Sequence, residues 1–323
     1  MDVQVAQINI GTMVAATDDP LVAEFMVNLE RINAIADTAP GFVWRLQTES
    51  GNATDIQIFP NPLTLLNMSV WESVDALKEY VYRSDHVEFF RRRAEWFEPD
   101  AKRVALWHVR AGVIPQLDEA VRRVAFLERN GASPYAFGFA KPPSPLVFEA
   151  TTPDDADTAD LIGRLNRELA VVATHPNENH FQLTTDEVTG NRGCMVRARY
   201  GEQLVGCGAV RTVGEGVGEI KRMFIDPAFR GSKFGAAILD QLELHARRLG
   251  LRELRLETSA KQPAAVRLYE GFGFTRSELW GEYRESPETS LCFAKRLDDP
   301  AQASAPDTRA AASTTSGPNR APG

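Results

Sequence analysis

The segment KRMFIDPAFRGSKFGAAILDQL, residues 221–242, constrains the fold more than any other part of the chain. A strand-like apolar stretch runs into a proline turn, a short glycine-containing loop and then an amphipathic, helix-like stretch. Backbone N–H groups point outward where a helix begins, and the helix dipole favours an anion there, so the loop suits phosphate. The predicted helix, residues 235–249, carries an apolar stripe that packs on a sheet: Gly235, Ile238, Leu239, Leu242, Ala246 and Leu249.

The composition favours an ordinary globular protein of two domains. The chain has 323 residues, of which 43% are hydrophobic and 25% charged. A net charge of -8 argues against a nucleic-acid partner held by a basic surface. The three cysteines form no CxxC pair, so we expect neither a disulfide framework nor a metal site. The N-terminus does not resemble a signal peptide and no long apolar run occurs, so we expect a cytoplasmic protein without a membrane partner.

Three closely spaced prolines, Pro142, Pro143 and Pro145, mark the expected domain boundary, because they stiffen the chain and prevent a regular element. The predicted domains are residues 1–142 and 143–298. From residue 301 the chain has no large apolar side chain, so we expect 299–323 to be a disordered tail.

The first half alternates strand-like and helix-like stretches, which predicts an α+β domain with helices on one face of a small sheet. The expected strands are residues 3–9, 41–47, 63–71 and 103–109, and the expected helices are 21–36, 73–97 with a break near Ser84, and 118–129.

The second half predicts a mixed sheet flanked by helices, with antiparallel hairpins first and a parallel crossover after Glu219. The expected strands are residues 146–150, 194–199, 204–211, 219–225, 253–258, 274–283 and 290–295, and the expected helices are 156–172, 235–249 and 264–272.

Three linked motifs in residues 146–297 resemble the GNAT acetyltransferase superfamily. Its acetyl-CoA loop has the form R/Q-x-x-G-x-G/A, in which Arg230 takes the first position and Gly235 the last, while Lys233 replaces the middle glycine. The preceding EIKRMFIDPAFRG and the later LRLETSAKQPAAVRLYEGFGF are also close to the family's forms, with Gln262 where an asparagine often stands. The resemblance implies a GNAT-type fold and acetyl-CoA as cosubstrate.

The resemblance also implies a set of cofactor-binding residues. The strand ending at Ile225 would splay from its parallel neighbour, so that the backbone of Met223, Phe224 and Ile225 binds the pantetheine arm. Arg230 would pair with phosphate, and the backbone amides of the loop and first helical turn would hold the pyrophosphate: Gly231, Ser232, Lys233, Phe234, Gly235 and Ala236. Lys233 is tolerable if its φ is negative, and its ammonium then helps to bind phosphate. A positive φ would cost about 1–2 kcal/mol and weaken CoA binding.

Two residues are candidates for moving protons. Tyr269 matches the family's general acid for the departing thiolate, although a core tyrosine on an amphipathic helix is the alternative. Glu219 is the candidate base, and strand alternation predicts that Lys221 and Met223 share its face. The alternative is an exposed glutamate paired with Lys221 or Arg222.

The acceptor is the least constrained partner. The resemblance indicates that residues 174–188, with His175 and His180, and residues 281–290 line its pocket. Three glutamates in the second segment, Glu282, Glu285 and Glu288, either attract a cationic amine or form a solvated turn. We expect an amine of a small molecule or peptide, attacked directly in a ternary complex without a cysteine acyl-enzyme. The alternative is a non-catalytic acyl-CoA-binding or regulatory module.

The first half resembles an uncharacterised bacterial domain family related in shape to the antibiotic-biosynthesis monooxygenases, which are dimeric α+β barrels of ferredoxin-like halves. The segments that carry the resemblance are GFVWRLQTE, NMSVWESVDALKEYVYRSDHVEFFRRRAEWFE, VALWHVRAG and LDEAVRRVAFLERNGASPYAFGF. Its many aromatic residues predict core packing and a homodimer face, with a small-molecule pocket or monooxygenase-like activity as the alternative.

Overall fold

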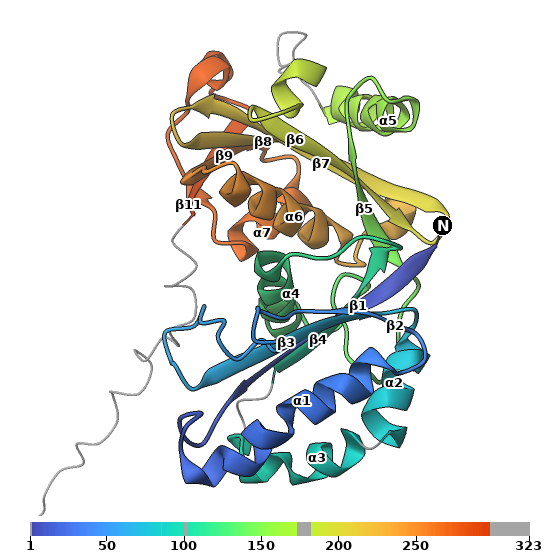
Figure 1. Ribbon diagram of the computed structural model, residues 1–323. Coiled ribbons are helices and arrows are strands. Elements are labelled where there is room, and N and C mark those ends of the chain that lie inside the picture. The colour runs from blue at the N-terminus through green and yellow to red at the C-terminus, as the bar shows by residue number, and fades with distance from the viewer. Residues whose placement is uncertain (1, 85, 100–102, 173–181, 298–323) are drawn as a thin grey trace, which may run out of the picture.

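The computed structural model describes residues 2–84, 86–99, 103–172 and 182–297. It contains a four-stranded sheet built by the first half of the chain and a seven-stranded sheet built by the second half (Figure 1). The predicted tail and His175 and His180 lie outside the described residues. Among the described residues, no helix is both long and apolar enough to cross a membrane.

The first sheet has the strand order β2-β3-β1-β4, and all its neighbours are antiparallel. The predicted elements are confirmed, including the break near Ser84, whose ψ of 177° is extended rather than helical. In chain order the elements are β1 (Val3–Thr12), η1 (Pro20–Val22), α1 (Ala23–Asp37), β2 (Phe42–Arg45), β3 (Thr64–Trp71), α2 (Val74–Arg83), α3 (His86–Arg92), η2 (Arg93–Glu95), β4 (Arg103–Arg110) and α4 (Leu117–Asn130).

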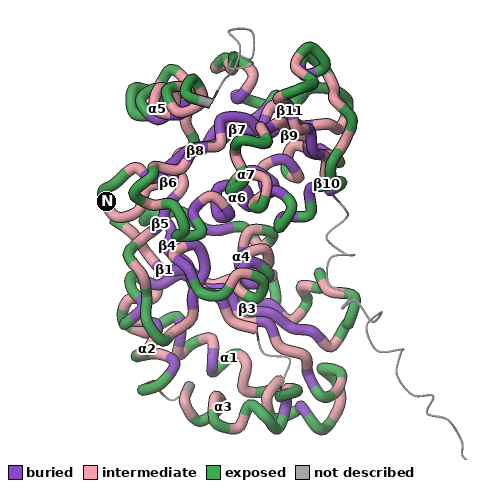
Figure 2. Tube along the Cα trace, turned by 180° about the vertical axis from the view of Figure 1, so that it is seen from behind, coloured by how far each residue is buried: buried purple, intermediate pink, exposed green. Residues whose placement is uncertain are grey.

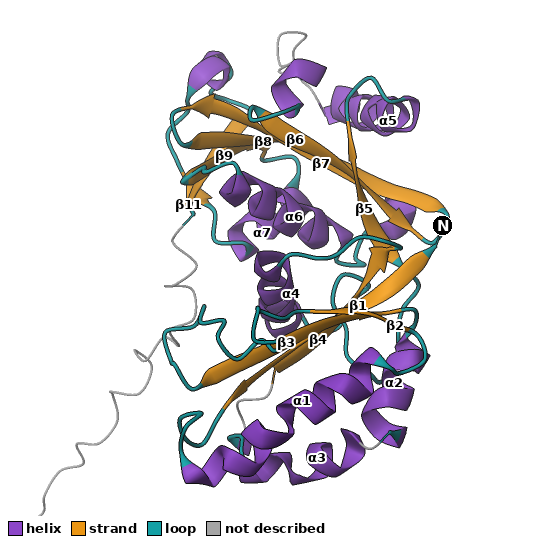
Figure 3. Cartoon of the chain, viewed as in Figure 1, coloured by secondary structure: helices purple, strands orange, loops and turns teal. Residues whose placement is uncertain are grey.

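Each face of this sheet is covered by a different layer. Helices α1, α2 and α3 lie on one side, and α4 lies on the other side, between the two sheets (Figure 3). Successive side chains of β4 point to opposite faces of the sheet, so this strand contacts both layers. Leu106 packs with Leu77 of α2. Trp107 packs with Ala120 and Val124 of α4. The sheet face that α1–α3 leave open is therefore filled by α4, so the prediction of helices on one face only is wrong.

The second sheet has the order β10-β11-β9-β8-β7-β6-β5, and only β8 and β9 are parallel neighbours. The predicted mixed sheet is confirmed. Its elements are β5 (Leu146–Thr151), α5 (Ala156–Val172), η4 (Thr185–Val188), β6 (Gly193–Tyr200), β7 (Gln203–Gly214), β8 (Val217–Ile225), η5 (Pro227–Phe229), α6 (Phe234–Arg248), β9 (Glu253–Ser259), α7 (Pro263–Gly271), β10 (Thr275–Arg276), η6 (Gly281–Glu285) and β11 (Ser290–Arg296). Figure 2 shows buried residues running through β7, β8 and α6, whereas α5 is largely exposed.

The predicted strand at residues 274–283 is wrong for most of its length. Only Thr275 and Arg276 pair with β11, and the chain then leaves the sheet and forms the 3-10 helix η6. Tyr283 of η6 is 2% exposed and donates a hydrogen bond to Glu219. A buried polar contact has thus prevailed over the strand propensity of the segment.

The predicted side-chain alternation along β8 is also wrong beyond Lys221. Between the pairs Cys207–Phe224 and Ala209–Lys221, two residues of β8 oppose one residue of β7, which is a β-bulge. Arg222 is the extra residue, with a φ of 57°. Glu219 and Lys221 therefore share one face of the sheet, while Met223 packs on the opposite face, against the core around α6.

A buried polar network joins the two halves where α4 lies beside α6. Arg122 of α4 forms ion pairs with Asp240 and Glu243 of α6, and both carboxylates are almost fully buried. The hydroxyl of Tyr135 donates to Asp240 Oδ2 at 2.7 Å and accepts from Gln241 Nε2 at 2.7 Å. Because unpaired charges are costly in a core, these pairs fix how the two halves meet.

The Glu243 pair gives a testable pH dependence. Burial alone would raise the pKa of Glu243, but Arg122 and Lys295 lower it from 4.5 to about 2. The carboxylate therefore stabilises the fold fully above pH 4.5, and this contribution, about 3 kcal/mol, is lost as the pH falls toward 2. Urea unfolding between pH 5 and pH 2 should show a smaller loss in Glu243→Gln than in the parent. The exposed-site control Glu270→Gln should follow the parent, and an equal loss in all three proteins would contradict this account.

Candidate active site

The central feature of the site is the place where β8 and β9 part. Their parallel pairing covers only residues 217–220 of β8 and 253–256 of β9. Beyond it, β8 follows β7 to Ile225, and β9 follows β11 to Ser259. The β9-facing backbone groups of Met223 and Ile225 thus lack a strand partner within the described part of the sheet, as the resemblance predicted.

Helix α6 begins at this same end of β8. A β-carbon on Gly235 would lie 3.3 Å from Leu268 Cδ2 of α7 and 3.6 Å from Ile225 Cγ1 of β8. The absence of a side chain at Gly235 therefore lets three elements meet closely. Tyr269, the candidate acid, follows Leu268 directly on α7.

The loop before α6 has the geometry of an anion site. Asp226 caps η5 by accepting from the Ala228 N–H at 2.9 Å, and Gly231 has a φ of 84°. The first N–H groups of an α-helix have no partner inside it, and Lys233 at the N-cap supplies no side-chain cap. The backbone amides from Lys233 to Ala236 are therefore suited to phosphate oxygens.

Arg230 lies at the edge of this loop, but its charge is already paired. Its Nη2 lies 2.6 Å from Glu168 Oε2 of α5, and its Nε donates to the Ile225 carbonyl at 3.1 Å. The guanidinium is half exposed, so the ion pair with Glu168 is weak and a phosphate can compete for it.

Lys233 has a backbone conformation that favours glycine. Its φ is 64°, in the left-handed region, so of the two alternatives the strained backbone is the one present. Its ammonium does not lie free beside the loop, because Nζ donates to the carbonyls of Asn130 and Ala132 in the first half. The backbone cost of about 1–2 kcal/mol therefore comes with contacts that a glycine lacks.

The side chain of Gln262 is fixed by a hydrogen bond, and that of Tyr269 by packing against other rings. Gln262 is the N-cap residue of α7, and its Oε1 accepts from Thr258 Oγ1 at 3.0 Å. Tyr269 is buried among aromatic rings, with Phe274 at 6.1 Å and Phe293 at 6.4 Å. Burial, and to a lesser extent the charge of Glu257, raises the pKa of Tyr269, so its hydroxyl stays protonated at neutral pH.

Glu219, the candidate base, is fully buried in a charged cluster. One carboxylate oxygen accepts from Tyr283, and the other lies 2.7 Å from Arg211 Nε. Lys221 Nζ lies 3.6 Å from Glu219 and 3.2 Å from Glu282. The expected pairing with Lys221 is therefore present, but the expected exposure of Glu219 is wrong. Burial, and to a lesser extent the negative charge of the nearby Glu219, raises the pKa of Tyr283.

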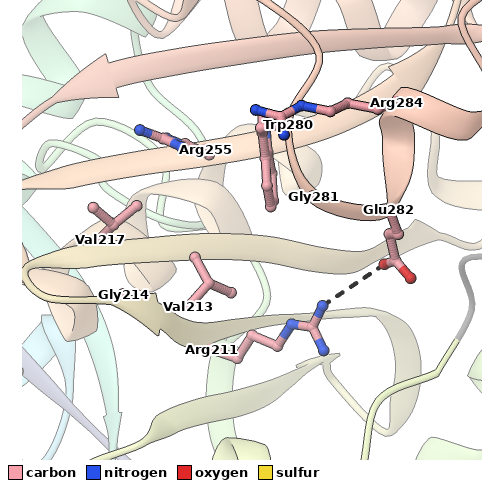
Figure 4. A pocket seen from close by; sticks show the side chains of 9 residues that line it. All are labelled: Arg211, Val213, Gly214, Val217, Arg255, Trp280, Gly281, Glu282 and Arg284. Atoms are coloured by element: carbon pink, nitrogen blue, oxygen red, sulfur yellow. Dashed lines mark ion pairs between the residues drawn. The ribbon is translucent and has the colours of Figure 1, made fainter.

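A pocket of about 470 Å³ lies beside this cluster on the same face of the sheet (Figure 4). It is rich in arginine, and the ring of Trp280 reaches toward its middle. The Trp280 indole N–H is buried and has no hydrogen-bond partner among the described residues. The lining residues are Arg211, Val213, Gly214, Val217, Arg255, Trp280, Gly281, Glu282 and Arg284.

Most of this pocket was not found from the sequence. Residues 281–290 were predicted to line it, and Glu282 does so. Glu282 does not attract ligands as a free carboxylate, however, because it is paired with Lys221 and lies 3.8 Å from Arg211. Arg211 and Arg255 lie in strands that the sequence predicts, but only the fold of η6 brings Arg284 to those strands.

Comparison with known proteins identifies the two halves separately. Residues 4–152 match a domain of unknown function, DUF3291, and residues 162–274 match the acetyltransferase (GNAT) family. An IAA acetyltransferase from Azospirillum brasilense is 36% identical over 138 residues, which cover 42% of this chain and 88% of that protein. An uncharacterized N-acetyltransferase from Schizosaccharomyces pombe is 37% identical over 125 residues, 36% of this chain and 74% of that protein.

A further uncharacterized N-acetyltransferase, YsnE from Bacillus subtilis, is 29% identical over 147 residues, 45% of this chain and 97% of that protein. Through its second half the chain belongs to the GNAT acetyltransferase family, and it is an acyltransferase. The predicted family of the second half is confirmed. For the first half, the likeness to monooxygenases in shape stays a prediction.

Proposed function

We propose that this protein transfers an acetyl group from acetyl-CoA to an amine by direct attack in a ternary complex. The observation that carries the proposal is the parting of β8 from β9 after Ile220 at the end of β8 where α6 begins. The pantetheine arm pairs with the β9-facing backbone groups of Met223 and Ile225, as an added strand would, and displaces Arg230 Nε from the Ile225 carbonyl. The pyrophosphate lies on the amides from Gly231 to Ala236, with Arg230 exchanging Glu168 for phosphate.

The reaction needs two proton movements. The amine nitrogen bonds to the thioester carbon and loses a proton, while the carbon–sulfur bond breaks and the thiolate gains one. Because burial raises the pKa of Tyr269 above that of an ordinary thiol, full proton transfer from it is uphill. Tyr269 therefore stabilises the departing thiolate chiefly as a hydrogen-bond donor, and the proton that the amine nitrogen loses reaches the thiolate through solvent.

The cysteines support direct attack rather than an acyl-enzyme. Burial raises the pKa of Cys194 to about 12, and that of Cys207 to about 12. Burial also raises the pKa of Cys292. Since the thiolate is the nucleophilic form, all three side chains are poor nucleophiles at neutral pH.

Glu219 has two open roles. As a base it would take the amine proton through water, but its oxygens already accept hydrogen bonds from Tyr283 and Arg211. Both oxygens are therefore already occupied by donors that the fold holds in place. We therefore favour Glu219 as the residue that orients Arg211 and Tyr283 at the pocket wall.

The arginine-rich pocket is the proposed acceptor site, and its chemistry fits an amine that also carries a carboxylate. Three of its lining residues are arginines and one is a glutamate. Arg255 lies over the Trp280 ring, and its ion pair with Glu253 is about one third exposed, so a ligand carboxylate can compete for its charge. The unpartnered Trp280 N–H offers a further donor, and Val213 and Val217 supply an apolar wall.

The role of Tyr269 is tested by Tyr269→Phe, which removes only the hydroxyl. We expect kcat to fall about 10–100-fold while the Kd for acetyl-CoA stays the same, because the lost hydrogen bond acts on the leaving thiolate. Steady-state kinetics and calorimetry measure the two quantities, with Tyr82→Phe on the exposed side of α2 as the control. An unchanged kcat would assign Tyr269 to the core alone, whereas a parent protein that binds acetyl-CoA but shows no turnover would favour the non-catalytic module.

The acceptor class is tested with amines matched in length that do or do not carry a carboxylate. We expect kcat/KM to favour the carboxylated amines by about tenfold or more, since a charge-assisted pair contributes that much. Arg255→Gln should abolish the preference, whereas Arg276→Gln, outside the pocket on β10, should keep it. A preference for uncharged amines, unaltered in Arg255→Gln, would refute the assignment.

For the first half, the strand order β2-β3-β1-β4 with antiparallel neighbours supports a ferredoxin-like sheet as part of this proposal. A homodimer through this half stays a prediction. Because α4 already covers the sheet face opposite α1–α3, such a dimer would need another surface.

A further inference from the structure

We infer that the first half of the chain is a positioning element for the acetyl-CoA loop, acting through Lys233. The inference rests on the proposed cofactor site. Lys233 is a positioning residue in this scheme: its backbone belongs to the loop, and its side chain is anchored more than a hundred residues away, at the C-terminal end of α4.

The end of α4 is built to receive a cation. Its C-cap, Gly131, has a φ of 69°, and its N–H bonds to the Leu127 carbonyl at 2.8 Å. This turn directs the carbonyls of Asn130 and Ala132 toward one point, where both accept from Lys233 Nζ. The final carbonyls of a helix carry the negative end of its dipole, so an ammonium is favoured there.

The anchored side chain explains why a lysine can stand at a position with positive φ. Glycine is the residue that adopts φ near 64° without strain, and the family's loop has glycine there. In this chain the tether to α4 holds the backbone of Lys233 in place instead. The loop's shape thus depends on a contact with the other domain rather than on the local sequence alone.

The anchor is one end of a long contact between α4 and the second half. Arg122 pairs with Asp240 and Glu243 in the middle of α6, and Asp118 pairs with Arg248 at its end, 2.8 Å from Nη2. The N-terminus, middle and C-terminus of α6 are therefore all tied to the first half. A helix held along its length presents its N-terminal amides in a fixed orientation, which lowers the cost of ordering them on a ligand.

The test compares the affinity of the full chain and its variants for acetyl-CoA by calorimetry. Lys233→Met removes the ammonium, and Lys233→Gly also removes the backbone strain. We expect both variants to raise Kd about tenfold, because each loses the anchor. Lys141→Met is the matched control: it removes an exposed ammonium outside both helices and the loop, and its Kd should equal that of the parent.

A second variant separates anchoring from direct contact between Lys233 and phosphate. Gly131→Ala strains the C-cap and places a methyl group about 3.6 Å from Lys233 Nζ, without touching the cofactor loop. We expect it to weaken acetyl-CoA binding as well, and the double variant Gly131→Ala/Lys233→Met to bind no more weakly than Lys233→Met alone. Thermal unfolding confirms that each variant is folded at the titration temperature.

The other possible results of these titrations would each contradict one part of the inference. Binding by Lys233→Gly as tight as or tighter than the parent's would show that the lysine is only a handicap. Additive losses in the double variant, or parent-like binding by Gly131→Ala, would assign Lys233 to direct phosphate contact. Parent protein that does not bind acetyl-CoA would refute the proposed function itself, and the inference with it.

Discussion

The site depends on the bulge at Arg222 in β8. One extra residue bends this strand, so that it follows β7 but can no longer pair with β9 beyond Ile220. The φ of Arg222, 57°, is unfavourable for an arginine, and contacts with α5 and with β7 hold the residue in this conformation. The guanidinium donates to Asn166 of α5 at 3.0 Å, and the backbone carbonyl accepts from Cys207. Without the bulge, β8 and β9 would continue to pair, and their hydrogen bonds would occupy the strand edge proposed for pantetheine.

The second constraint is the contact between α4 and α6. It buries paired charges at Arg122, Asp240 and Glu243, and it carries the Lys233 anchor at one end. A fused domain that only accompanied an acetyltransferase would need no such contact with the cofactor helix. The buried network joins the two halves along α6, which is the contact that the inferred positioning role of the first half requires.

The sequence was sufficient for most regular elements and for the loop between β8 and α6, because apolar periodicity and turn residues are local signals. It was insufficient where a distant partner decides the conformation. The bulge at Arg222, the 3-10 helix that brings Tyr283 to Glu219, and the positive φ of Lys233 all depend on contacts between segments far apart in the chain. The arginine-rich pocket proposed for the acceptor was missed for the same reason, since its arginines come from three separate elements.

The most direct test of the account is amide hydrogen exchange of the full chain with and without acetyl-CoA. The account predicts that the cofactor slows exchange in residues 222–237, where the free strand edge and the start of α6 supply the N–H groups, and leaves α1–α3 unaffected. Exchange that is unchanged in residues 222–237, or slowed only in the first half, would contradict the assignment of the acetyl-CoA site.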